Sequence, residues 1–249
     1  DDYDSLTPGR LAIRPKAQRT IGLGDYRIRV DAGVPARGYA QAAGGGGMSV
    51  TAVDAAGRVA WRNDPGTAFV GASRNSVNWF FRSKAGAFWP DIDRSARLTS
   101  QIITESRRSG GKAVIRGLIR GGGQTAPYTV TMTEVPRSRS VTALDIEVSV
   151  GRLSGGKWVT SVMLTSGRGR AVGVHGLGEQ FRPFDLSGQI MPILVQEQGV
   201  TRGEEPAAAI VDLATWGAGN LNTSYAPWPT YVTDQKRSFE LVDDLRSGA

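Results

Sequence analysis

The chain has 249 residues, of which 40% are apolar, 33 are glycine and 12 are proline, and its Lys and Arg residues outnumber Asp and Glu by 30 to 23. This length and composition predict a globular chain with a sizeable core and exclude a disordered polypeptide. Cysteine is absent, which excludes disulfides, thiolate nucleophiles and zinc–thiolate sites, and no run of 18 apolar residues is present to span a membrane.

The positive charge is spread over scattered arginines. The densest groups, Arg107 with Arg108 and Arg137 with Arg139, have no interleaved aromatic residues and no nucleic-acid-binding motif. We therefore predict a solvated basic surface without a nucleic-acid partner, and such a surface also suits an anionic sugar as ligand. The chain begins at Asp1 without an initiator Met. Together with the missing cysteines this is compatible with an exported bacterial protein, but it leaves the localisation open.

Residues 1–24 show no clear periodicity and are predicted to form an irregular N-terminal arm. From residue 25 onward, β-branched residues alternate with polar ones in short runs separated by Gly, Ser, Pro and Arg. The runs are residues 26–30, 48–54, 59–61, 97–105, 112–120, 128–135, 141–150 and 158–164. No convincing helical period is present. The pattern predicts an all-β, antiparallel sandwich that extends over residues 25–249.

Aromatic residues are densest at residues 78–81 (NWFF) and 88–90 (FWP). Aromatics at this density usually fill the space between two sheets, and a sugar-stacking platform is the alternative. Toward the C-terminus, an apolar segment at residues 207–215 is followed by predicted strands at residues 230–233 and 238–242.

The stretch from residue 174 to 202 is the richest in turn signals. Gly176 and Gly178 bracket Leu177, a spacing that suits backbone with positive φ or close approach to another segment. Asp185 opens an Asp-Leu-Ser-Gly turn, residues 191–196 form a predicted strand, and Gln198-Gly199 turns again. Two polar turns around a strand are typical of a site on the rim of a β scaffold, and a structural hairpin with solvated tips is the alternative.

Few residues are candidates for a catalytic role. His175 is the single histidine, and a satisfied structural role is favoured for it over a catalytic one. Glycoside hydrolysis needs two facing carboxylates, but turn hydrogen bonds alone account for Glu179, Asp185 and Glu197. We predict no catalytic residue, no metal site and no cofactor in this chain.

The segments GVHGLGEQFRPFDLSGQIMPILVQEQGVTRG (173–203) and GAGNLNTSYAPWPTYVTDQKRSFEL (217–241) resemble the N-terminal domain of glycoside hydrolase family 31. That family comprises retaining α-glucosidases, α-xylosidases and sulfoquinovosidases, and the EQF…DLxG…EQGVxR form is most similar to the sulfoquinovosidase-like branch. The resemblance covers about the last third of the chain. It implies a β-super-sandwich of the galactose-mutarotase-like type, packed against a catalytic (β/α)₈ barrel.

In this family both catalytic aspartates lie on the barrel, whose signatures are missing here. The resemblance therefore implies that the chain alone does not hydrolyse glycosides but shapes the pocket for an α-glycoside, with a barrel domain or chain as partner. It places Glu197, Gln198 and Arg202 in the pocket wall, and Glu179 and Asp185 in supporting turns. Arg202 could bind an anionic substrate through two hydrogen bonds or be held by a carboxylate of a barrel loop.

Two other functions remain open. A stand-alone carbohydrate-binding sandwich without catalysis would present a row of exposed aromatics, for which the candidates are Trp79, Trp89, Trp216 and Trp228. A mutarotase-like enzyme would need a histidine paired with a carboxylate in a cleft, with His175 the one histidine available.

Overall fold

The computed structural model describes residues 8–14, 20–32, 48–74, 77–82, 87–92, 96–138, 141–167, 173–178, 184–188 and 226–242. All regular elements in these ranges are strands, and nearly all of them pair antiparallel, which confirms the prediction of an all-β fold consistent with a sandwich. The chain divides into two units. The sandwich unit is Asp4–Ser76 with Asp93–Gly169, and the C-terminal unit is Asp1–Tyr3, Val77–Ile92 and Arg170–Ala249.

The largest sheet of the sandwich unit has the order β1-β10-β11-β12-β13. Its strands are β1 (Leu11–Ile13), β10 (Ser100–Ser109), β11 (Lys112–Gly121), β12 (Gln124–Ser138) and β13 (Val141–Val150). The strands β10 to β13 form an antiparallel meander, whereas β1 lies parallel to β10 at the edge, with Ala12 opposite Ile102. Alternate side chains of β12, namely Ala126, Tyr128, Val130 and Met132, are buried.

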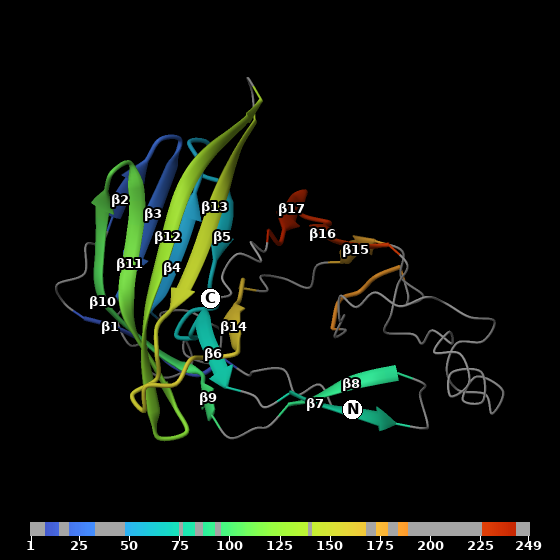
Figure 1. Cartoon of the computed structure of the whole chain (residues 1–249). Coiled ribbons are helices and arrows are strands. Elements are labelled where there is room, and N and C mark those ends of the chain that lie inside the picture. The colour runs from blue at the N-terminus through green and yellow to red at the C-terminus, as the bar shows by residue number, and fades with distance from the viewer. Residues whose placement is uncertain are drawn as a thin grey trace, which may run out of the picture. The chain divides into compact units, whose positions relative to one another are not determined.

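A second sheet has the order β2-β3-β4-β5, formed by β2 (Thr20–Leu23), β3 (Tyr26–Asp31), β4 (Ser49–Val53) and β5 (Val59–Arg62). Figure 1 shows it in blue and cyan as a layer behind the green and yellow strands of the first sheet. Alternation in β3 buries Tyr26, Ile28 and Val30, and the Tyr26 hydroxyl donates a hydrogen bond to the Thr142 carbonyl on the opposite sheet. The two sheets thus enclose one apolar core.

A third sheet in this unit has the order β14-β6-β9, formed by β6 (Val70–Arg74), β9 (Ala96–Leu98) and β14 (Ser161–Leu164). Two buried polar side chains in this part of the unit accept hydrogen bonds from backbone N–H groups. Gln101 Oε1 accepts hydrogen bonds from the backbone N–H groups of Phe69 and Val70 at 2.9 and 3.2 Å. Asn63 Oδ1 accepts one from Val50 N–H at 2.7 Å. Both side chains replace backbone partners that these strands lack at this point.

The structure adds detail to the strand assignments made from the sequence at two points. Residues 1–24, predicted to form an irregular arm, contain β1, which pairs with the distant strand β10, and β2, which forms a hairpin with β3. Both strands are too short to show periodicity. The single run predicted at residues 97–105 is split at Thr99, where the chain passes from the third sheet into the first. The prediction of one sandwich domain over residues 25–249 stays a prediction.

The described residues of the C-terminal unit form two small sheets. A hairpin is formed by β7 (Val77–Arg82) and β8 (Ala87–Ile92), in which Phe80 is opposite Trp89. A three-stranded sheet has the order β15-β16-β17, formed by β15 (Val174–Gly178), β16 (Pro227–Thr233) and β17 (Arg237–Glu240). The strand predicted at residues 191–196 and the apolar segment at 207–215 lie outside the described residues.

Candidate functional site

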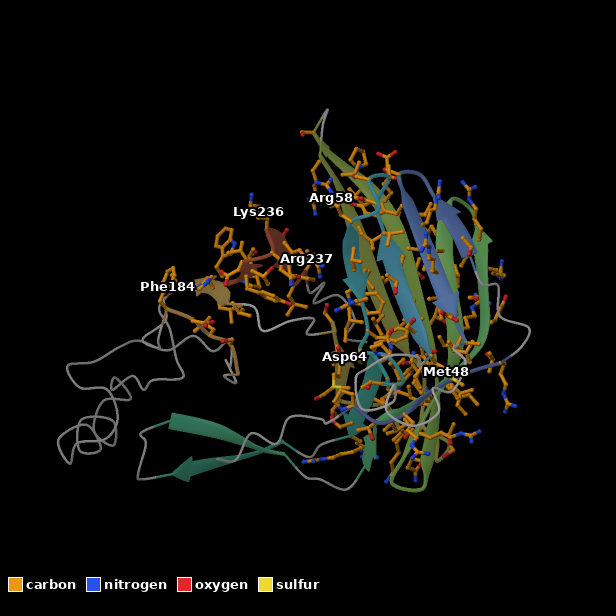
Figure 2. The ribbon with its side chains drawn as sticks, turned by 180° about the vertical axis from the view of Figure 1, so that it is seen from behind. Met48, Arg58, Asp64, Phe184, Lys236 and Arg237 are labelled. Atoms are coloured by element: carbon orange, nitrogen blue, oxygen red, sulfur yellow. The ribbon has the colours of Figure 1, made fainter. Side chains whose placement is uncertain are left out.

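The predicted site residues fall mostly outside the residues that the structure describes. Glu179, Glu197, Gln198 and Arg202 are among those outside, so their roles stay predictions, whereas Asp185 is described. The described part of the site region is the sheet β15-β16-β17 with the turn at residues 184–188. Figure 2 labels Phe184 beside this sheet and Lys236 on the turn between β16 and β17.

The strand β15 has an unusual backbone at the Gly-Leu-Gly sequence. Gly176, Leu177 and Gly178 have φ values of 124°, 64° and 82°, as the spacing of the glycines predicts. Positive φ is rare for a branched residue such as Leu177, so the two flanking glycines let the chain make this irregular turn. The pairing with β16 is regular from Val174 to Gly176 and then slips.

Gly176 is also a point of close approach. A Cβ atom built at this position would lie 2.7 Å from the Thr230 carbonyl oxygen and 3.0 Å from the Tyr231 Cα. Both contacts are to backbone, which cannot move aside like a flexible side chain. On the other side of β16, the ring of Tyr231 stacks on the ring of its β17 partner Phe239, with the ring centroids 4.9 Å apart. Only glycine therefore allows β15 and β16 to lie this close.

The turn at residues 184–188 is held to β15 by Asp185. Its Oδ1 accepts hydrogen bonds from Val174 N–H at 3.0 Å and from Ser187 N–H at 2.9 Å, and Leu186 N–H donates to the Val174 carbonyl at 2.7 Å. The bond from Val174 N–H, followed by those from Ser187, holds the pKa of Asp185 below its ordinary value, because these bonds stabilise the ionised carboxylate. Asp185 is thus the polar centre of a small backbone junction.

His175 connects this turn to the turn between β16 and β17. Its Nδ1 lies 2.9 Å from the Phe184 carbonyl oxygen, and its Nε2 lies 3.1 Å from Asp234 Oδ1 on the turn between β16 and β17. Both neighbours are acceptors, and only the imidazolium form of histidine can donate from both nitrogens at once. The Phe184 carbonyl first, and then Asp234, raise the pKa of His175 above its ordinary value.

The second oxygen of Asp234 completes the arrangement. Asp234 Oδ2 accepts a hydrogen bond from Gly173 N–H at 2.9 Å. A side chain at Gly173 would collide with this carboxylate and with the ring of His175, since a Cβ there would lie 2.5 Å from Asp234 Oδ2 and 2.9 Å from His175 Nε2. We call His175, Phe184 and Asp234 the histidine clamp.

The geometry limits what His175 can do chemically. Its side chain is 22% exposed, and the Phe184 ring covers it at a centroid distance of 4.5 Å. In the imidazolium form, with both nitrogens engaged, it has no free nitrogen to take a proton from a bound sugar. The arrangement fits the structural role that the sequence favours. The described residues contain no cluster of three or more His, Asp or Glu side chains placed to hold a metal ion.

Sequence reasoning did not find Asp234 as the partner of His175, because 59 residues separate them in the chain. It also missed Trp158, which is 59% exposed and whose ring is capped by the Arg152 guanidinium at 4.6 Å from the ring centroid. Trp228, one of four tryptophans proposed as sugar-stacking candidates, is 66% exposed. The side chains of Trp79, Trp89 and Trp216 are not described.

The C-terminal unit exposes several large apolar side chains. Phe184 is 85% exposed, and the others, which exceed 40%, are Trp228, Val232, Leu241 and Val242. Isolated exposed apolar residues are common on soluble proteins, but five within two short segments are more than scatter predicts. No helix in the described part of the chain is long and apolar enough to cross a membrane.

Comparison with known proteins gives a partial relationship. No protein-family model matches the chain. A stretch of 70 residues is 36% identical to the sulfoquinovosidase of Escherichia coli (strain K12), covering 25% of this chain and 9% of that enzyme. The chain therefore spans well under two thirds of that relative. The similarity points to a relationship with glycoside hydrolases.

Proposed function

We propose that this chain is the N-terminal domain or subunit of a retaining α-glycosidase of the sulfoquinovosidase- or α-glucosidase-like type, and that it shapes the substrate pocket of a catalytic (β/α)₈ barrel carried elsewhere. The observation that carries the proposal is the 36% identity over 70 residues with a sulfoquinovosidase. The all-β fold and the exposed apolar residues around β16 and β17 support it, since a domain that packs against a barrel needs an apolar face.

Within this proposal, Glu197, Gln198 and Arg202 form part of the pocket wall. An arginine in such a wall can bind a sulfonate through two parallel, charge-assisted hydrogen bonds. The neutral hydroxyl at the same position of a glucoside offers no such pairing. The ratio of activities toward the two substrates therefore depends on Arg202.

The first test is the intact mass of the protein purified from its native source, with identification of any chain that co-purifies. The proposal expects a mass well above 26.5 kDa, or a tightly bound second chain with barrel sequence. A lone 26.5 kDa species without a partner refutes it. The working function is then the alternative, a stand-alone carbohydrate-binding sandwich, which the exposed Trp158 and Trp228 favour.

The second test uses that complete enzyme with aryl α-sulfoquinovoside and aryl α-glucoside. Losing a bidentate, charge-assisted contact costs about 1.5–3 kcal/mol, so Arg202→Gln is expected to lower kcat/KM for the sulfonated substrate roughly 10- to 150-fold and to spare the glucoside. Arg58→Gln is the matched control, because Arg58 is exposed on a turn of the sandwich unit. Equal losses with both substrates would show that Arg202 holds a loop instead of the substrate.

A further inference from the structure

The histidine clamp joins three separate segments through one titratable ring. His175 lies on β15, Phe184 opens the turn at residues 184–188, and Asp234 lies on the turn between β16 and β17. The Gly173 N–H bond to Asp234 and the absence of a Cβ at Gly173 fix the carboxylate against the ring. Among the described residues, the charged groups that act on His175 are the carboxylates of Asp234 and Asp185.

We propose that His175 is a proton-dependent clamp, which in its imidazolium form binds the Phe184 carbonyl and Asp234 together and, on losing one proton, keeps Asp234 and releases Phe184. The choice of bond follows from the two acceptors. A neutral ring carries one N–H, and its other nitrogen presents a lone pair. A lone pair facing the Asp234 carboxylate is repelled more strongly than one facing the neutral Phe184 carbonyl, so the proton remains on Nε2.

Release of Phe184 leaves the rest of the junction in place. Asp185 still accepts from Val174 N–H and Ser187 N–H, and Leu186 N–H still donates to Val174. The change is therefore confined to the start of the turn and to the Phe184 ring that covers the imidazole. It is a local loosening on β15 and not an unfolding of the sheet.

The direction of the pH effect follows from the two states. The folded chain holds the pKa of His175 above its ordinary value of 6.5. The stabilisation of the folded chain by the clamp is therefore complete below pH 6.5, and it is lost as the pH rises through the raised pKa. Lower pH, down to the range in which carboxylates titrate, tightens the junction.

The chain has a single histidine, which makes the test direct. With 15N-labelled histidine, NMR of the full chain reports the protonation of each ring nitrogen across the titration without assignment ambiguity. We expect a midpoint above pH 6.5, protonation of both nitrogens below it, and the Nε2–H tautomer above it. We also expect the protection of amides near Phe184, relative to the intrinsic exchange rate at each pH, to fall above the midpoint.

Two variants separate the clamp from an ordinary buried histidine. Asp234→Asn is expected to lower the midpoint and to leave the Phe184 contact intact at low pH. His175→Gln is expected to make the protection of amides near Phe184, relative to the intrinsic exchange rate, the same on both sides of this midpoint. A midpoint at or below pH 6.5 in the unaltered chain, an Nδ1–H tautomer at high pH, or a midpoint unchanged in Asp234→Asn would each overturn the proposal. None of these measurements requires glycosidase activity, so their outcome does not depend on the proposed function.

Discussion

Gly176 and Gly188 provide a matched pair for measuring what close strand packing requires of the chain. Both have positive φ, at 124° and 74°. A Cβ at Gly188 would have no atom within 4 Å, whereas one at Gly176 would lie 2.7 Å from the Thr230 carbonyl oxygen. Substitution by alanine therefore imposes backbone strain at both positions but a steric conflict at Gly176 alone.

The expected magnitudes follow from these two terms. A residue with a Cβ at positive φ costs about 1–2 kcal/mol, and forcing an extra methyl group between packed backbones costs about 1–3 kcal/mol more. Alanine also restricts the unfolded chain, which offsets the cost by about 0.4–1 kcal/mol at both sites and cancels in the comparison. We expect Gly188→Ala to destabilise the C-terminal unit by about 1 kcal/mol and Gly176→Ala by about 2–4 kcal/mol.

The assay is urea unfolding followed by the NMR signal of His175, which lies one residue from Gly176 and reports this unit without interference from the sandwich unit. Equal midpoints for the two variants would refute the reasoning, because they would show that β15 and β16 can separate without cost. A larger loss in Gly188→Ala would also refute it, since that outcome cannot come from steric conflict.

Two further predictions concern side chains that satisfy backbone groups. Gln101→Met leaves the buried N–H groups of Phe69 and Val70 without an acceptor. In urea titrations monitored by circular dichroism, it is expected to lower the free energy of unfolding of the sandwich unit by about 2–4 kcal/mol. The same change at the less buried Gln124 is the control, and a loss at Gln101 below about 0.5 kcal/mol would mean that other partners replace the amide. Since the pKa of Asp185 is held below its ordinary value of 3.8, its contribution to stability is present above that pH and lost as the pH falls through the lowered pKa. Asp185→Asn should flatten this acid limb when the His175 signal is followed in urea below pH 5, and an unchanged limb would contradict the assigned hydrogen bonds.

The long strands could be predicted from the sequence because apolar and polar residues alternate along much of their length. In β12, for example, Ala126, Tyr128, Val130 and Met132 are buried and the residues between them are more exposed. The short strands β1 and β2 could not be predicted in this way. Three or four residues carry no measurable period, and the partner of Ala12 in β1 is Ile102, about 90 positions away, whereas β2 pairs with the adjacent strand β3.

The site region shows the same limit. The glycines around Leu177 indicated positive φ, because glycine is chemically distinct at such positions. The pairing of His175 with Asp234 left no local signal, since a lone histidine and a lone aspartate in a turn each have many unrelated explanations. Only the folded sheet brings the ends of β15 and β16 together.

The strands β6 and β9 have a consequence for how this chain can be altered. Arg74 at the end of β6 is the Cα partner of Ala96 at the start of β9. The chain therefore exits the third sheet and re-enters it at paired positions. The chain between β6 and β9 carries β7 and β8, which pair with each other, so β6 and β9 are in effect a β-hairpin with one long connection. The entropy of closing such a loop grows only with the logarithm of its length, about 0.6 kcal/mol for each doubling. Insertions and deletions between β6 and β9 can therefore change the C-terminal unit while the sandwich unit keeps its strand register, so this connection is a suitable place to insert or remove a module.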